Sequence, residues 1–269
     1  MSRYRATVEY AGDHFHGSQI QPDVRTVQGE LEAALQRLAD EPVRILAAGR
    51  TDSGVHATAQ EIGFGLARPW EAAELRQALA AVVPDDIRVR TVRPVGEDFH
   101  PRFGATARRY EYFVDPRPPC PLRSNRVWGI GEKLDPRALR TSARLLLGEH
   151  DFARFARSGQ PDVSPICTVE RAEWTTTDLG DLRFVVVADR FLHRMVRYLV
   201  ATLIDVATGR RSPEDWQRLV RDGSGRAPEP APAGGLYLTG VRYVDGWNQD
   251  PGVPGLWPVP NRTNGAGEA

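Results

Sequence analysis

A short polar segment, residues 49–57 (GRTDSGVHA), carries the residue types in this chain that could do chemistry. It places the carboxylate of Asp52 between two glycines, with Arg50 two residues before it and His56 four residues after it. Flanking glycines let a ligand approach the backbone closely, and a nearby guanidinium favours the ionised, nucleophilic form of a carboxylate. An isolated aspartate in a glycine-rich turn more often caps a helix. Here the density of functional side chains favours a nucleophile.

The elements on either side of this segment must position it. Residues 4–10 alternate as a half-buried strand does, and apolar residues at helical spacing predict a helix over 27–38 with Thr26 as its N-cap. Residues 43–48 form a short apolar run that predicts a strand entering the loop at Gly49. Helices are predicted in the rest of the chain over 70–83, over 136–147 with Asp135 as N-cap, from His193 to about Thr208, and in a short segment opened by Ser212-Pro213. Strands are predicted over 87–92, 105–114, 169–176, 182–188 and 236–244.

Composition places the chain among ordinary globular proteins. Of its 269 residues 41% are hydrophobic and 26% charged, which provides enough length and apolar sequence for a core. Thirty-five basic side chains balance thirty-five acidic ones, so no overall field directs the protein to a nucleic acid or a membrane. Locally, residues 102–126 hold six arginines against two acids, and residues 190–211 hold five against one. Such excess suits phosphate contacts, although a solvated surface would look the same.

Cysteine content and the N-terminal sequence indicate the compartment. Cys120 and Cys167 are too few for a disulfide framework or a four-thiolate zinc site, which favours a reducing environment. The first residues lack the apolar stretch of a signal peptide, and no window is long enough to span a bilayer. We therefore expect a soluble, cytoplasmic protein without membrane association. His56 and His193 have no companion residues at ligand spacing, so we expect no metal and no cofactor.

Five ordered motifs carry a resemblance to a known family. Residues 49–57 resemble the active-site motif GRTDAGVHA of the TruA family of tRNA pseudouridine synthases, with Ser53 in place of alanine. The resemblance covers the chain from about Tyr4 to Tyr243, and five matches in one order are rare by chance. The later matching segments are 99–103 (FHPRF) with 105–112 (ATARRYEY), 146–152 (LLGEHDF), 191–197 (FLHRMVR) and 235–238 (GLYL).

The resemblance implies isomerisation of uridine to pseudouridine in RNA. In this reaction the N-glycosidic bond breaks, the uracil turns in place, and a carbon–carbon bond to the ribose forms. The expected substrate is the anticodon stem-loop of tRNA, at positions 38 to 40 in tRNA numbering. A base that leaves a stacked loop loses roughly a few kcal/mol of stacking, which a guanidinium and an aromatic face can replace.

Four residues take catalytic roles by this resemblance. Asp52 is the nucleophile, and Arg50 and the ring of Tyr110 extract and hold the target base. Arg197 forms an ion pair that keeps Asp52 deprotonated, although from its helical spacing alone it could lie on a solvated polar face. Tyr112 shares a strand face with Tyr110, so the choice of Tyr110 rests on the motif. Substrate contacts are expected from Tyr110, Arg50, His56, Arg108, Arg109 and His193.

The fold implied is of the α+β class, with two α/β subdomains that meet at an active-site cleft. Each subdomain has a mixed or antiparallel sheet covered by helices. We place a domain with the Asp52 loop at residues 1–104, a second domain at 105–245, and an extended tail at 246–269. Family members are homodimers whose RNA groove uses both subunits. A homodimer is therefore expected here, and its two-fold axis would double each basic patch.

The N-terminal segment departs from the family pattern. Ala11 and Ser18 stand where relatives usually carry an aspartate and a tryptophan. This departure leaves open a first alternative, a diverged paralogue that supplies pseudouridine to a C-nucleoside biosynthetic pathway. A second alternative is a catalytically silent RNA-binding protein. The joint presence of Asp52, Arg50, Tyr110 and Arg197 argues against it, because binding alone has no use for a shielded nucleophile.

Overall fold

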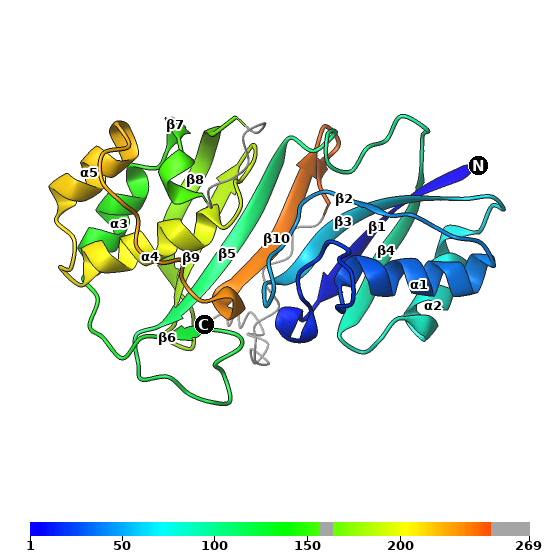
Figure 1. Cartoon of the computed structure of the whole chain (residues 1–269), viewed down its shortest axis with the longest axis horizontal. Coiled ribbons are helices and arrows are strands. Elements are labelled where there is room, and N and C mark those ends of the chain that lie inside the picture. Colours follow the sequence, from blue (N-terminus) through cyan, green and yellow to red (C-terminus); the bar gives the residue numbers. More distant parts are fainter. Residues whose placement is uncertain (157–163, 249–269) are drawn as a thin grey trace, which may run out of the picture.

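Strands from both halves of the chain pair into one mixed β-sheet. The computed structural model describes residues 1–156 and 164–248, and within them eleven strands belong to this sheet. They are β1 (Ser2–Tyr10), β2 (Leu46–Ala47), β3 (His56–Leu66), β4 (Ile87–Val95), β5 (Ala107–Asp115), β6 (Trp128–Gly129), β7 (Gly148–Asp151), β8 (Ile166–Thr176), β9 (Leu182–Ala188), β10 (Leu236–Tyr243) and β11 (Gly246–Trp247). Along the main path their order is β4-β1-β3-β10-β5-β9-β8-β7 (Figure 1).

The last long strand, β10, joins the two halves of the sheet. It pairs in parallel with β3 at Tyr237 and Leu238, and antiparallel with β5 from Leu236 to Arg242. This mixed sheet and its helices confirm the predicted α+β class. The division into domains at 1–104 and 105–245 stays a prediction, because β10 lies in the second segment and pairs with strands of both.

Helices cover the sheet and share one hydrophobic core. In the described part of the chain they are α1 (Val27–Ala39), α2 (Ala72–Val82), α3 (Pro136–Arg144), α4 (Met195–Ala207) and α5 (Pro213–Arg221), with short 3-10 turns η1 (Gly12–His14), η2 (Ala153–Phe155) and η3 (Ala233–Gly235). Helices α1 and α2 lie beside β1, β3 and β4, and α3 to α5 lie beside β7 to β9 (Figure 1). All five α-helices contribute buried residues to a single apolar cluster. Burial of this shared face holds the two halves in one body.

Capping residues fix where three of the helices begin. The side chains of Thr26, Asp135 and Ser212 accept backbone N–H groups in the first turns of α1, α3 and α5. Each cap satisfies a donor that has no partner inside its helix. These three starts are as the sequence predicted.

Strand β3 is the main element that the sequence pattern missed. Of the predicted strand 43–48 only Leu46–Ala47 is extended, whereas His56–Leu66 forms a strand buried along nearly its whole length. A strand that is buried on both faces does not alternate, and its alanines and glycines carry little β-propensity. The helix predicted to reach residue 147 ends at Arg144, and Gly148–Asp151 forms the edge strand β7 instead.

The C-terminal segment is described only in part. Of the predicted tail 246–269, Gly246–Trp247 forms β11 beside β10, and Asn248 follows it. Residues 249–269 lie outside the described residues. In the rest of the chain that the structure describes, no helix combines the length and the apolar character needed to cross a membrane.

Candidate active site

Asp52 lies between two nitrogen-bearing side chains from the start of α4. Its Oδ2 accepts a hydrogen bond from Nη1 of Arg197 at 3.0 Å, and its Oδ1 lies 3.1 Å from Nε2 of His193. The side chains of Asp52 and Arg197 retain 18% and 14% of their exposure, so the pair is largely enclosed but reachable. The guanidinium supplies a counter-charge and fixes the direction of the carboxylate. The predicted Asp52–Arg197 pair is thus formed.

The backbone at the start of α4 brings both partners to Asp52. Arg194, the N-cap residue, has a left-handed conformation with φ of 65°, which is uncommon for a residue other than glycine. This turn separates His193, which precedes the helix, from Arg197 in the first turn. Nε of Arg197 donates to the carbonyl of Ala231 at 2.7 Å, and the N–H of Ala231 donates to the carbonyl of Arg197 at 3.1 Å. The loop before β10 therefore holds the guanidinium in place.

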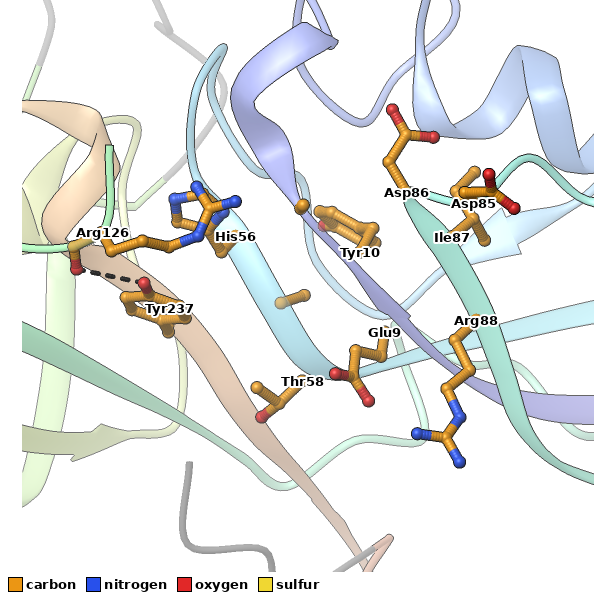
Figure 2. A pocket seen from close by; sticks show the side chains of 12 residues that line it. Glu9, Tyr10, His56, Thr58, Asp85, Asp86, Ile87, Arg88, Arg126 and Tyr237 are labelled. Atoms are coloured by element: carbon orange, nitrogen blue, oxygen red, sulfur yellow. Dashed lines mark hydrogen bonds between the residues drawn. The ribbon is translucent and has the colours of Figure 1, made fainter. Parts of the chain in front are cut away.

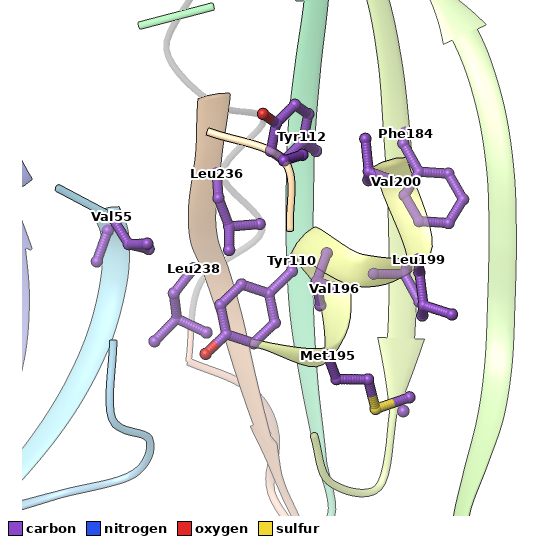
Figure 3. Close-up of a cluster of buried hydrophobic side chains, with 14 of the residues drawn as sticks. Val55, Tyr110, Tyr112, Phe184, Met195, Val196, Leu199, Val200, Leu236 and Leu238 are labelled. Carbon is purple, nitrogen blue, oxygen red and sulfur yellow. The ribbon is translucent and has the colours of Figure 1, made fainter. Parts of the chain in front are cut away.

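Tyr110 stands on β5, on the side of the sheet that α4 covers (Figure 3). Its ring meets the edge of Phe191 at a centroid distance of 5.0 Å, and only 8% of the residue is exposed. Burial raises the pKa of the Tyr110 phenol well above its usual value, and the neighbouring Tyr10 and Asp52 raise it further. The hydroxyl is therefore protonated at neutral pH.

Hydroxyl contacts separate Tyr110 from Tyr112. Oη of Tyr112 donates to the carbonyl of Pro232 at 2.7 Å, and this residue is fully buried. Among the described residues, the hydroxyl of Tyr110 has no hydrogen-bond partner. A tyrosine hydroxyl that makes no hydrogen bond to the protein is available to a bound molecule. The structure thus distinguishes two tyrosines that sequence alternation could not.

Arg50 and its loop are held by residues that the sequence analysis did not select. Arg50 is exposed, and within the described residues its guanidinium makes no ion pair or hydrogen bond. Ser18 and Gln60 bind the backbone on either side of it. In the sequence Ser18 is recognisable only as a departure from the family pattern, and Gln60 lies on the unpredicted strand β3. A polar residue inside a fully buried strand is the signal that could have identified Gln60.

The guanidinium of Arg108 donates hydrogen bonds to backbone carbonyls of the protein instead of pointing into solvent. Its guanidinium donates to the carbonyls of Ala48, Ala105 and Asp189 at 3.2, 3.0 and 2.8 Å, and to that of Arg102. Burial lowers the pKa of Arg108 from its usual value. In this conformation its donors are directed to the protein, so the structure gives no support to the expected substrate contact. Arg108 instead links the start of the Asp52 loop to residues 102–105.

Arg109 points to the opposite face of β5 from Tyr110, because successive strand residues alternate. Its Nε and Nη2 donate to the side chain and the carbonyl of Thr239, both at 3.1 Å. Its guanidinium also lies 5.3 Å from the ring centroid of Trp247. The structure therefore does not bring Arg109 together with Asp52. The expected substrate contact of Arg109 stays a prediction without support from this geometry.

His56 also has both ring nitrogens engaged by the protein. Nδ1 accepts the N–H of Gly12 at 2.9 Å, so Nε2 carries the proton and donates to the carbonyl of Asn125 at 2.7 Å. The ring stacks on Tyr237 at 4.7 Å. Burial lowers the pKa of His56, and the imidazole is neutral. In the structure His56 joins the backbone at Gly12 to the backbone at Asn125 beside the Asp52 loop. This geometry gives no support to a substrate contact.

A cavity of about 310 Å³ lies beside His56 (Figure 2). Its walls include Tyr237, Arg126, Thr58 and Glu9, and Tyr237 donates to the carbonyl of Arg126 at 3.0 Å. None of Asp52, Arg50, Tyr110 or Arg197 lines it. This cavity is therefore separate from the candidate active site.

The residues brought together at Asp52 supply a carboxylate with a guanidinium counter-charge and, from Tyr110, a protonated phenol. Asp52 comes from the loop before β3, Tyr110 from β5, and His193 and Arg197 from the start of α4. In residues 1–156 and 164–248, no group of three or more His, Cys, Asp or Glu side chains is placed to hold a metal ion. The arrangement can attack an electrophilic carbon and exchange protons with an enclosed ligand.

Comparison with known proteins matches two segments of the chain that include most of these site residues. A family profile described as tRNA pseudouridine synthase matches residues 6–104 and 142–244. Arg50 and Asp52 fall in the first matched segment and Arg197 in the second, while Tyr110 lies between the two.

Curated relatives match over nearly their whole length. The protein of Xanthobacter autotrophicus is 39% identical over 246 residues, 90% of this chain and 100% of that protein. Those of Caulobacter sp. and Bacillus licheniformis are 41% and 39% identical over 248 residues, again 90% of this chain and 98% and 99% of the relatives. All three are named tRNA pseudouridine synthase A.

Proposed function

The chain belongs to the tRNA pseudouridine synthase family, and on this premise we propose that it converts uridine to pseudouridine in tRNA through Asp52. The reaction is an isomerisation in which the bond from N1 of uracil to the ribose breaks and a bond from C5 forms. C5 loses a proton and N1 gains one, so the atoms of the nucleotide are unchanged. The enclosed Asp52–Arg197 pair is the observation that supports this chemistry most strongly.

Asp52 is the proposed nucleophile. Its carboxylate attacks C1′ of the ribose as the bond from C1′ to N1 of uracil breaks. The uracil turns, and C5 then attacks C1′ and displaces the carboxylate, which restores Asp52. Arg197 supplies the counter-charge and His193 lies against the second carboxylate oxygen. Arg50, which is exposed beside the nucleophile, is the proposed group that replaces stacking and phosphate contacts when the base leaves the RNA loop.

Tyr110 is the proposed proton-transfer group. Its raised phenol pKa keeps the proton on the hydroxyl, so Tyr110 does not act as a preformed phenolate. It can accept the C5 proton as its own proton passes to solvent, from which N1 of uracil takes up a proton, and its ring can support the turned uracil. The lack of a protein partner for this hydroxyl among the described residues favours such a contact with substrate.

The finer features of the substrate and assembly extend this proposal. We propose uridines 38 to 40 of the anticodon arm as targets, and a cytoplasmic homodimer as the active form. A two-fold axis places two copies of every exposed arginine around bound RNA. The departure at Ser18 does not remove any group from the Asp52 cluster, because Ser18 binds the loop backbone.

The proposal is tested by incubating the purified protein with unmodified tRNA transcript, and separately with uridine and uridine monophosphate. Pseudouridine is then located by mass spectrometry of nuclease fragments. We expect conversion in tRNA at positions 38 to 40 and none in the free nucleoside or nucleotide. Conversion of the monophosphate alone would favour a role in C-nucleoside supply, and no conversion in any substrate would contradict the proposed function.

A further inference from the structure

The backbone of the nucleophile loop is bound on both sides of Arg50 by two buried polar side chains. Gln60, on β3, donates from Nε2 to the carbonyl of Gly49 at 2.7 Å and accepts the N–H of Gly49 at 3.3 Å through Oε1. Only 1% of Gln60 is exposed. One amide side chain thus satisfies both polar groups of the peptide residue before Arg50, as a strand partner would.

Ser18 makes the equivalent pair of bonds after Arg50. Its Oγ accepts the N–H of Thr51 at 2.8 Å, and its own N–H donates to the carbonyl of Thr51 at 3.0 Å. The carbonyl of Ser18 accepts the N–H of Gln28 at 3.0 Å, which ties this segment to the first turn of α1. The loop backbone is therefore connected to an element that is itself packed in the core.

Glycine at position 17 allows this close approach. Gly17 has φ of +97°, and a Cβ built on it would lie 3.0 Å from the carbonyl oxygen of Thr51. The left-handed conformation strains any residue with a side chain, and the close backbone oxygen leaves little room for one. A third contact, 2.8 Å between the hydroxyl oxygens of Tyr10 and Thr51, joins β1 to the same loop residue. The segment 17–18 is thus shaped to fit the loop.

We propose that Gln60 and Ser18 are positioning residues, which fix the peptides at Gly49 and Thr51 so that Arg50 and Asp52 face the substrate in register. This inference rests on the proposed function of Asp52. Arg50 has no side-chain partner among the described residues, so the peptides on either side of it, which Gln60 and Ser18 bind, help to set its direction. Asp52 directly follows Thr51, so a shift of the loop moves its carboxylate relative to His193 and Arg197. Displacement of a catalytic group by about 1 Å can lower a rate by about 100-fold.

The first test compares Gln60→Leu and Ser18→Ala with Thr58→Val as the matched control. Thr58 lies on the same strand and is 5% exposed, and its hydroxyl has no hydrogen-bond partner within the described residues. We expect Gln60→Leu to lower kcat on tRNA by about 10- to 100-fold with KM changed by less than about 2-fold. Ser18→Ala should give a smaller loss in the same direction, and Thr58→Val should match the wild type.

The second test uses Gln60→Glu and its pH profile. A protonated glutamic acid can donate to the carbonyl of Gly49 as the amide does, whereas the ionised form repels it. The kcat of Gln60→Glu should therefore recover as the pH falls and decline as the pH rises through the pKa of the introduced group. A residue with only a general packing role would not give this profile.

Amide hydrogen exchange provides a readout that does not depend on activity. Exchange at Gly49 and Thr51 should be faster in Gln60→Leu and Ser18→Ala than in the wild type, and unchanged in Thr58→Val. Unaltered exchange, unaltered kcat in Gln60→Leu, or an equal loss of kcat in Thr58→Val would overturn the positioning role. If the wild-type protein forms no pseudouridine, the proposed function is contradicted. If the two variants still exchange faster than the wild type in that case, the role of Gln60 and Ser18 in fixing the loop backbone remains supported.

Discussion

Single side chains around Asp52 have separate tasks that substitutions can distinguish. Arg197 touches the carboxylate at 3.0 Å and is held by the loop before β10, whereas the hydroxyl of Tyr110 meets no protein group among the described residues. We expect the first residue to act on the proposed nucleophile and the second to contact the substrate. Loss of each should therefore affect different steps.

Arg197→Met should impair turnover more than RNA binding. It removes the guanidinium counter-charge from an enclosed carboxylate and leaves the contact with His193 in place. We expect kcat to fall by about 100-fold or more at neutral pH. Arg210→Met is the control, because Arg210 pairs with Glu132 and Asp205 away from this cluster. Wild-type turnover in Arg197→Met at neutral pH would leave Arg197 with a structural role only.

Tyr110→Phe and Tyr110→Ala should separate the hydroxyl from the ring. Phenylalanine keeps the ring and its contact with Phe191 but loses the group assigned to proton transfer. We expect Tyr110→Phe to bind tRNA normally and to turn over slowly. Tyr110→Ala should also lose ring support worth about 1–3 kcal/mol per stacked base. Single-turnover rates and filter binding measure the two effects, and a near-normal rate for Tyr110→Phe would restrict the residue to a stacking role.

Residue types and motifs predicted the chemical groups of the site better than the directions of its side chains. Asp52 and Arg197 meet as the resemblance implied, and His193 lies against the carboxylate. Arg108 and His56 were expected to contact substrate, but their nitrogens are engaged by the protein. A sequence motif shows which residue is present but not whether its donors are used internally, because that depends on carbonyls distant in sequence.

At the scale of elements, the loop before β3 depends on contacts from the N-terminal segment. His56, at the start of β3, binds the backbone of Gly12 in η1 and of Asn125 in the connector after β5. A Cβ added at Gly12 would lie 2.2 Å from the carbonyl oxygen of Val55, so this turn packs directly on the loop. The neutral imidazole therefore joins three segments that are far apart in sequence.

The linkage through His56 makes the fold sensitive to acid. Burial holds the pKa of His56 below the usual histidine value of 6.5, and a proton on Nδ1 would oppose the N–H of Gly12. The unfolded chain takes up this proton as the pH falls through about 6.5 while the folded state resists it, so stability is present above that pH and declines below it. We expect His56→Gln to make the free energy of unfolding less dependent on pH. Between about pH 7 and 5 the variant should lose about 1 kcal/mol less stability than the wild type loses. Denaturant titrations at several pH values measure this, and an unchanged slope would contradict it.

At the scale of the whole molecule, the strand order joins what the sequence suggested were two domains. Tyr237 of β10 pairs with His56 of β3 although the two residues are 181 positions apart in a chain of 269, and β10 lies between β3 and β5 in the sheet. Local patterns predicted most individual elements, but no local signal indicates a pairing of this range. The number of arginines in a segment also did not predict how much unpaired positive charge the segment presents. In the basic segment 102–126, Arg117 and Arg123 pair with Asp115 and Asp181.

One continuous sheet and one shared core predict cooperative unfolding. Because β10 pairs with strands of both halves, neither half keeps its edge covered when the other unfolds. We expect a single calorimetric transition. Its calorimetric enthalpy, taken per unit that unfolds, should equal the van't Hoff enthalpy. Two resolved transitions would instead support independent domains at 1–104 and 105–245.

The most direct test of the central claim is pseudouridine formation in unmodified tRNA by Asp52→Asn. Asparagine has nearly the shape of aspartate and can still accept from Arg197, but it cannot act as an anionic nucleophile. The preparation must be free of host enzyme, and binding and thermal unfolding are measured in parallel. We expect no pseudouridine from the variant, with tRNA affinity and melting temperature close to those of the wild type. More than trace conversion by a folded Asp52→Asn protein would contradict the assignment of Asp52 as the nucleophile.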